Sequence, residues 1–279
     1  MIIDFHTHIF PKAVLENRSN FFEGETAFKL LYENDKSTMV GVDQLIASMD
    51  KDHVDKSVVF GFPWKHEEFF KMNNDCVMEA VNKYPDRLYG FCCLDPYHPN
   101  SLKEVERCLN FGLSGVGELG FYTSDINDET IHYMKPIMEI ARIQNKPVMI
   151  HTNEPVGHLY PGKTPLSVKS IYHFIESFPD NTIVLAHWGG GVFFYHLLKK
   201  ETKNVLNNVY VDSAASLYLY DQRIWSVACD IIGSEKILFG TDYPLLPANR
   251  YFKQIEMNTN VRASDKENIF GQSALRILS

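Results

Sequence analysis

Two histidines separated by one residue, His6 and His8, are the first feature of the sequence that could do chemistry. In a β-strand, alternate residues point to the same face, so the two imidazoles would project together. Two imidazoles fixed on one rigid element can ligate a divalent metal ion. A His-x-His pair also occurs at ordinary strand ends, so by itself it does not decide between a metal site and two unrelated polar residues.

Further polar residues stand directly after short apolar segments. They are Glu118 after Gly-Val-Gly, His151 after Val-Met-Ile, His187 after Val-Leu-Ala and Asp242 after Phe-Gly-Thr. If these segments are parallel strands of one barrel, their carboxyl ends meet at the same rim. Imidazole and carboxylate groups are the usual ligands of catalytic zinc. The pattern therefore predicts a metal site at that rim.

The elements that would position these residues are short apolar runs alternating with segments of helical periodicity. Near-continuous apolar runs are typical of parallel strands that are covered on both faces. Amphipathic helices are predicted over 69–84, 101–111 and 264–278, the last opened by a Ser264-x-x-Glu267 capping box. The predicted strands are 2–5, 56–60, 88–94, 115–119, 147–150, 182–186, 208–211 and 236–239.

This alternation predicts an α/β fold, a (β/α)8 TIM barrel of the metal-dependent hydrolase type. A doubly wound open sheet is an alternative that periodicity does not exclude. The chain has 279 residues, close to the roughly 250 of a typical barrel, and we expect one domain over 1–279. Two long connections, 11–42 and 151–166, would lie near the active-site face. Connections of this length often form lids or binding loops.

Composition and charge limit the partners. The net charge of −8 argues against nucleic-acid and anionic-membrane surfaces, which depend on clustered positive charge. No apolar run approaches the roughly 18 residues of a membrane span, and the N-terminus lacks the pattern of a secretory signal. The five cysteines show no Cys-x-x-Cys spacing. We therefore predict a cytoplasmic protein with reduced thiols, a small-molecule substrate and no nucleic-acid or membrane partner; homo-oligomerisation is left open.

Three residues near the expected rim are candidates for substrate binding. Trp64 follows the second predicted strand, Trp188 follows His187, and Arg250 lies eight residues after Asp242. Aromatic side chains at a barrel mouth often line a pocket, and an arginine can bind a substrate carboxylate. Packing between loops explains the tryptophans equally well, and a solvated helix start explains Arg250.

Together these motifs resemble the amidohydrolase superfamily, in particular the branch that contains aminocarboxymuconate-semialdehyde decarboxylase. The resemblance covers essentially the whole chain. It implies a (β/α)8 barrel with a divalent metal, usually Zn²⁺, held by His6, His8, His151 and Asp242. It also implies that His187 polarises the substrate or relays a proton. The motifs that carry it are 3–8, 117–119, His151, 186–191, 212–215 and 240–244.

The number of metals stays open at this point. In related metal-dependent deoxyribonucleases of the superfamily, a glutamate at the position of Glu118 bridges two metals, and the histidine at the position of His187 ligates the second. We expect one metal, with a second site that depends on Glu118 as the alternative. Asp4 would either support the metal ligands or be a buried carboxylate bonded to backbone amides, and the sequence does not favour one of these roles.

The predicted function is metal-dependent hydrolysis of a small lactone, amide or ester that carries a carboxylate. A bound metal lowers the pKa of its water to about 7; Asp242 would accept the proton and His187 would stabilise the developing oxyanion. The alternative is non-oxidative decarboxylation of an unsaturated or aromatic acid on the same ligands. Lys65 is the only cation just after the second strand, and Arg87 precedes the third; this scarcity of cations favours hydrolysis. A catalytically silent metal-binding barrel is a third, weaker alternative.

Overall fold

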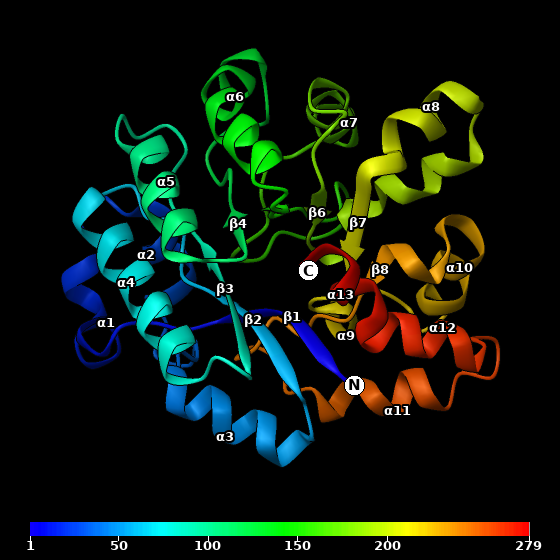
Figure 1. Ribbon diagram of the computed structural model, residues 1–279, viewed down its shortest axis with the longest axis horizontal. Coiled ribbons are helices and arrows are strands. Elements are labelled where there is room, and N and C mark those ends of the chain that lie inside the picture. Colours follow the sequence, from blue (N-terminus) through cyan, green and yellow to red (C-terminus); the bar gives the residue numbers. More distant parts are fainter. Residues whose placement is uncertain (279) are drawn as a thin grey trace.

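The computed structural model describes residues 1–278, in which eight parallel strands follow one another in order around a barrel (Figure 1). Backbone hydrogen bonds from Phe5 N to Phe239 O and from Asp242 N to His6 O join the last strand region to the first. The predicted (β/α)8 barrel is confirmed. The strands are β1 (Ile3–His8), β2 (Lys56–Phe60), β3 (Leu88–Cys92), β4 (Gly115–Leu119), β5 (Val148–Ile150), β6 (Ile183–Leu185), β7 (Val209–Asp212) and β8 (Ile237–Leu238).

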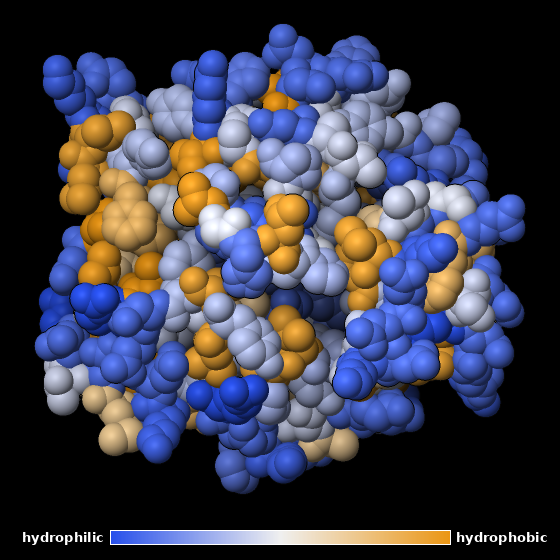
Figure 2. All heavy atoms as spheres, turned by 180° about the vertical axis from the view of Figure 1, so that it is seen from behind, coloured by the Kyte–Doolittle hydropathy of each residue, from blue (hydrophilic) through white to orange (hydrophobic). Residues whose placement is uncertain are grey.

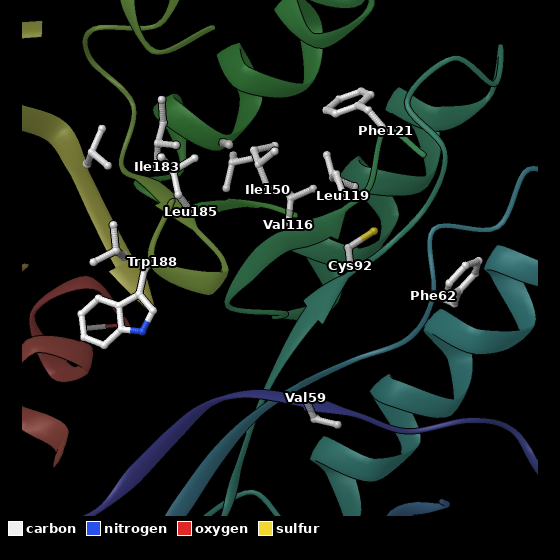
Figure 3. Packing of buried hydrophobic residues seen from close by; sticks show 14 of the residues in the cluster. Val59, Phe62, Cys92, Val116, Leu119, Phe121, Ile150, Ile183, Leu185 and Trp188 are labelled. Atoms are coloured by element: carbon white, nitrogen blue, oxygen red, sulfur yellow. The ribbon is translucent and has the colours of Figure 1, made fainter. Parts of the chain in front are cut away.

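Alternate residues of these strands divide between two apolar clusters, as the period-two geometry of a strand requires. Val59, Cys92 and Ile150 belong to the outer cluster, between the strands and the surrounding helices (Figure 3). Their sequence neighbours Val58 and Met149 belong to the inner cluster. Because both faces of each strand are buried, the strands read as continuous apolar runs in the sequence.

Helices surround the barrel (Figure 1). The observed α4 and α5 agree with the predicted 69–84 and 101–111. The longer helices are α3 (Val42–Asp52), α4 (Glu67–Lys83), α5 (Ser101–Phe111), α6 (Asp128–Ile143), α7 (Val168–Ser177), α10 (Ile224–Ile232) and α11 (Asn249–Glu256). The other helical elements between β6 and β8 are η2 (His187–Leu197), α8 (Lys200–Val205), η3 (Leu206–Asn208), α9 (Ser216–Leu219) and η4 (Ser234–Lys236). Among residues 1–278, no helix is both long and apolar enough to cross a membrane.

The C-terminal segment covers the end of the barrel at which the strands begin (Figure 1). Ala274 and Ile277 pack in the inner cluster with Ile3 of β1. The helix predicted over 264–278 is confirmed as a helical segment, but it is not a regular α-helix throughout: it forms α12 (Ala263–Glu267), a π-helical turn η5 (Asn268–Gln272) and α13 (Ser273–Leu278). The predicted capping box is also absent: the first turn is instead held by Asp265, which accepts hydrogen bonds from Arg262 and Ser234.

The two long connections differ from each other. The first, 11–42, contains α1 (Lys12–Glu16), η1 (Arg18–Phe21) and α2 (Thr26–Tyr32), so it is a folded excursion. The second, 151–166, has neither helix nor strand in the described chain. Both leave from carboxyl ends of strands, as expected. The face opposite the C-terminal helix is hollowed near its centre (Figure 2).

Candidate metal centre

The barrel brings all six predicted rim residues into one cluster. His6 and His8 end β1, Glu118 lies in β4, and the other three follow β5, β6 and β8. The Nε2 atoms of His6 and His8 are 3.2 Å apart. Asp242 Oδ1 lies 3.5 Å from His6 Nε2 and 3.3 Å from His8 Nε2. Imidazole nitrogens and a carboxylate oxygen therefore converge on a small volume.

Glu118 lies in the middle of this cluster, with its two oxygens facing different histidines. Oε2 is 3.6 Å from His6 Nε2 and 3.9 Å from His8 Nε2. Oε1 is 2.9 Å from His151 Nδ1 and 3.7 Å from His187 Nε2. Within each potential ligand group, such as Glu118 with His151 and His187, the donor atoms all lie within 4.8 Å of one another. A carboxylate in this position can contribute to one metal site or bridge two.

Each histidine of the cluster directs one ring nitrogen to the centre and bonds the other to an outer oxygen. An oxygen of a carbonyl or carboxylate only accepts, so the outer nitrogen carries a proton, and loss of the proton from the inner nitrogen would leave a lone pair there for a metal. This is the arrangement in which histidine binds a metal. The outer bonds are His6 Nδ1 to Asp212 Oδ2 (2.8 Å), His8 Nδ1 to Gly61 O (3.1 Å), His151 Nε2 to Gly162 O (3.0 Å) and His187 Nδ1 to Ala214 O (3.0 Å).

Charges in the cluster are strongly coupled. Burial by itself would raise the pKa of Glu118, but His6 and His151 outweigh it and lower that pKa to about 2. Burial opposes a charge on His6, yet Glu118 and Asp212 raise its pKa to about 10. Burial likewise opposes the charged form of Asp242, whose pKa His8 and His6 hold far below its ordinary value. The carboxylates are thus ionised at neutral pH, and the positive charge that they attract is one that a divalent cation supplies.

His187 differs from the other members of the cluster. Burial and the neighbouring His151 lower the pKa of its imidazole. The ring is therefore neutral at pH 7, with its proton directed at Ala214 O and a lone pair at Nε2. Donor types, tautomers and charge together fit a divalent metal.

Backbone conformations at the rim are unusual. His187 and Asp242 have φ of 54° and 66°, in the left-handed region that costs energy for residues other than glycine. Such conformations persist where the surrounding structure imposes them, commonly at functional sites. Gly190, with φ of 58°, lies so close to the next loop that a Cβ would come within 2.4 Å of Asn153 O. The glycines after His187 therefore serve a tight turn and a close backbone approach.

The three predicted substrate-binding residues lie elsewhere. The rings of Trp64 and Trp188 are fully buried, and their Nε1 atoms donate to Asn73 Oδ1 and Ser216 Oγ. Both therefore belong to the core, in contrast to the expectation that they line a pocket, because the helices after β2 and β7 cover them. Arg250 is exposed on α11 and borders an open hollow of about 700 Å³ with Arg223 and Lys253, a hollow that shares no residue with the histidine cluster.

Asp4 is a buried carboxylate bonded to backbone amides and to Thr241, which is one of the two roles considered above. Its Oδ1 accepts from the backbone N–H groups of His6 and Thr241, and its Oδ2 accepts from Thr241 Oγ1. Within the described residues, its hydrogen bonds go to backbone groups and to Thr241 and not to a ligand imidazole. Burial raises the pKa of this carboxyl to about 7. Its bonds to His6 N and to Thr241 join β1 to the segment after β8.

The sequence analysis included Asp212 in a motif of the resemblance but assigned no role to it, although it is the residue that orients His6. Asp212 ends β7 and is fully buried. Besides the His6 ring, it accepts from His187 N and Ala214 N. The rule that located the other polar residues, a charged group at the end of an apolar strand, applies equally to Asp212.

Comparisons with known proteins agree with this architecture. A protein-family model described as Amidohydrolase matches residues 3–279. A 2-amino-3-carboxymuconate-6-semialdehyde decarboxylase of Dictyostelium discoideum is 24% identical over 339 aligned positions, covering 99% of this chain and 91% of that protein. A gamma-resorcylate decarboxylase of Polaromonas sp. (strain JS666) is 22% identical over 270 positions, covering 82% of this chain and 81% of the other.

A solved structure shows the same fold. It is a dihydroxybenzoic acid decarboxylase from Polaromonas sp. JS666, with bound manganese and the inhibitor 2-nitroresorcinol. Its TM-score with this chain is 0.72, at 17% sequence identity, over 99% of this chain and 96% of that one.

Proposed function

The chain belongs to the Amidohydrolase family, and from that premise we propose that it is a metal-dependent decarboxylase of a small aromatic or unsaturated carboxylic acid. The observation that carries the proposal is that both curated relatives, which align with 99% and 82% of the chain, are decarboxylases. This favours the alternative of the sequence analysis over the predicted hydrolysis. Scarcity of cations near the second and third strands does not count against a decarboxylase, because a bound metal can itself neutralise the substrate carboxylate.

The proposed metal is held by His6, His8, His151 and Asp242, with Glu118 between them. Nitrogen and oxygen donors of this kind suit both zinc and manganese, and manganese is the ion in the similar dihydroxybenzoic acid decarboxylase. The predicted preference for zinc therefore widens to a divalent ion of either kind. When bound, such an ion supplies positive charge that fixes and polarises the substrate's acidic end.

One substitution, Glu118→Ala, distinguishes one bound ion from two. Glu118 contacts histidines on both sides, so a second ion near His151 and His187 would depend on its carboxylate. We propose one ion. After saturating reconstitution with Mn²⁺ or Zn²⁺, one equivalent per chain is expected in the wild type. Two equivalents that fall to one in Glu118→Ala would establish the two-metal alternative.

Loss of CO₂ from an aromatic acid leaves an electron pair on the ring carbon, and that carbon must receive a proton. Asp242 lies at the rim beside His6 and His8 and is partly accessible. Asp242 is ionised at neutral pH, so it would first take a proton from solvent water and then pass it to the ring carbon, and Asp242 is the proposed proton donor. His187, with a lone pair at Nε2, would accept a hydrogen bond from the substrate and orient it.

An apolar side chain of the barrel interior lies beside the histidines of β1. The Phe60 ring lies 5.1 Å from the His6 ring and 4.7 Å from the His8 ring, between centroids. Phe60 itself is fully buried. Electrostatic interactions are stronger on such a surface than in water.

A mixed panel of substrates tests the proposal. Metal-loaded protein is incubated with hydroxybenzoates, unsaturated diacids, lactones and carboxylate-bearing amides, while CO₂ release and acid release are followed in parallel. We expect CO₂ release from an acid, abolished by chelation and reduced at least 100-fold in Asp242→Asn. Acid release from a lactone or amide, without CO₂, would instead establish hydrolysis.

A further inference from the structure

Two tyrosines that the proposed chemistry does not use lie beside the metal cluster. Tyr32 is the last residue of α2, and Tyr122 follows β4. The Tyr122 ring is 5.3 Å from the His151 ring. The Phe62 ring connects the two, at 6.0 Å from Tyr122 and 6.1 Å from Tyr32. Segments far apart in the sequence thus form one aromatic wall.

Both phenols remain protonated. Burial raises the pKa of Tyr32, and the carboxylates of Asp242 and Glu118 raise it further. The ordinary pKa of a phenol, about 10, leaves the hydroxyl of Tyr122 protonated at neutral pH. The hydroxyls are consequently neutral donors next to a strongly charged cluster.

Neither hydroxyl has a hydrogen-bond partner within residues 1–278. Other half-buried or buried phenols do have one: Tyr97 pairs with Thr130 and Tyr251 donates to Thr241 O. Neither hydroxyl is among the sealed side-chain atoms without a partner, which in the described chain are those of Ser57, Tyr220 and Trp225, so both are open to water or to a ligand. With no protein partner, these two donors are available to a ligand.

The helix that carries Tyr32 is fixed at both ends. Glu25, which precedes α2 and is 1% exposed, accepts from the backbone N–H groups of Lys65 and His66 and from His66 Nδ1. At the other end, Arg18 Nη1 donates to Tyr32 O and Ser37 O. The first long connection thus fixes the position of Tyr32, so ligand binding does not lose free energy in ordering this residue.

We propose that Tyr32 and Tyr122 determine specificity by donating hydrogen bonds to ring oxygens of a hydroxylated aromatic acid. The metal cluster takes the carboxylate end, and the two neutral donors take hydroxyl or phenolate oxygens on the same ring. The inference rests on the proposed function for its substrate class. A site built to bond a hydroxyl discriminates strongly against the analogue that lacks it, because its donors are then left unpaired.

Binding of two inert probes tests this inference without requiring turnover. Metal-loaded wild type, Tyr32→Phe, Tyr122→Phe and the double variant are titrated by calorimetry with 2-nitroresorcinol and with nitrobenzene, which lacks both hydroxyls. Tyr133→Phe, which removes the hydroxyl of a 39% exposed tyrosine on α6, is the matched control. Metal content and thermal midpoint are measured for each protein, so that a merely structural effect is visible.

The wild type is expected to bind 2-nitroresorcinol more tightly than nitrobenzene. Each single variant should weaken 2-nitroresorcinol binding about 3- to 10-fold, the ordinary worth of one hydrogen bond, and leave nitrobenzene, metal content and midpoint unchanged. Equal affinities for the two probes in the wild type, binding of neither, or equal losses in a variant and in Tyr133→Phe would overturn the inference. Tyrosine-dependent binding without CO₂ release from any acid would uphold it while refuting the proposed reaction.

Discussion

Replacing Asp212 with asparagine tests how the protein prepares His6 for a metal. The carboxylate is fully buried and makes three bonds: Oδ1 accepts from His187 N (2.9 Å) and Ala214 N (3.0 Å), and Oδ2 accepts from His6 Nδ1 (2.8 Å). An asparagine has the same shape but offers one acceptor oxygen and one donor group. The two orientations of the asparagine side chain therefore differ in how they affect the free energy of folding and metal binding.

With its oxygen towards the two backbone N–H groups, the asparagine places its NH₂ against His6 Nδ1. That nitrogen must then accept, so the imidazole proton moves to Nε2, the atom that faces the cluster. The opposite orientation leaves two buried N–H groups without an acceptor, at about 1–3 kcal/mol each. The first orientation is cheaper for folding, and it removes the lone pair by which His6 binds a metal.

Loss of a group that orients a metal-binding histidine typically weakens metal affinity 10- to 100-fold, which is roughly 1.4–2.7 kcal/mol. We expect this loss in Asp212→Asn, measured by competition with a chromophoric chelator at pH 7. Asp4→Asn is the matched control: Asp4 is as buried, but its Oδ2 partner is the Thr241 hydroxyl, which can turn to accept from the amide. Wild-type metal affinity in Asp212→Asn, or an equal loss in both variants, would refute this reasoning.

Other expectations follow from the same structure. Chelation of the metal should lower the thermal midpoint by roughly 8–16 °C relative to protein at a thousandfold excess of free metal over its dissociation constant, and an unchanged midpoint in scanning calorimetry would contradict metal binding by the folded cluster. Glu25→Ala should cost about 2–4 kcal/mol in urea unfolding, since it leaves the N–H groups of Lys65 and His66 without their acceptor; a loss below 0.5 kcal/mol would contradict the proposed anchoring of α2. Arg262 and Ser234 lower the pKa of Asp265, so this carboxylate stabilises the fold above its unfolded pKa and the stabilisation disappears as the pH falls through the folded value. Arg262→Ala should accordingly narrow the gap in stability between pH 7 and pH 3, and a gap as wide as in the wild type would count against the pairing.

The rim of the barrel could be predicted because a strand end is a local feature of the sequence. Glu118, His151, His187 and Asp242 each follow a run of apolar residues, and parallel strands in a barrel must all end at one rim. A one-dimensional pattern therefore specified a three-dimensional cluster. The strand β1 extends through His8, beyond the predicted 2–5, so both histidines stand on the strand itself.

The walls of the site could not be predicted in this way, because they depend on how loops fold back. Trp64 follows a strand just as His187 does, but Phe28 of α2 packs at 4.2 Å from its ring, between centroids, and buries it. Tyr32 lies far from any strand end, and only the helix that carries it brings it to the cluster. Likewise, the Ser264 pattern did not predict how the first turn of α12 is held. Asp265 holds it through a bond from Ser234, which is 31 residues away in the sequence.

The bond from His151 Nε2 to Gly162 O joins a metal-binding residue to the irregular connection 151–166. A bond that is present in only one conformation of that connection makes the conformation and the metal affinity of His151 thermodynamically linked, and such linkage is reciprocal. If the ordered conformation of 151–166 raises the metal affinity by some factor, bound metal raises the equilibrium constant for ordering 151–166 by the same factor. Metal loading should therefore protect the peptide bonds of 151–166 from proteases, which would make the entrance of the site a reporter of the ion inside it.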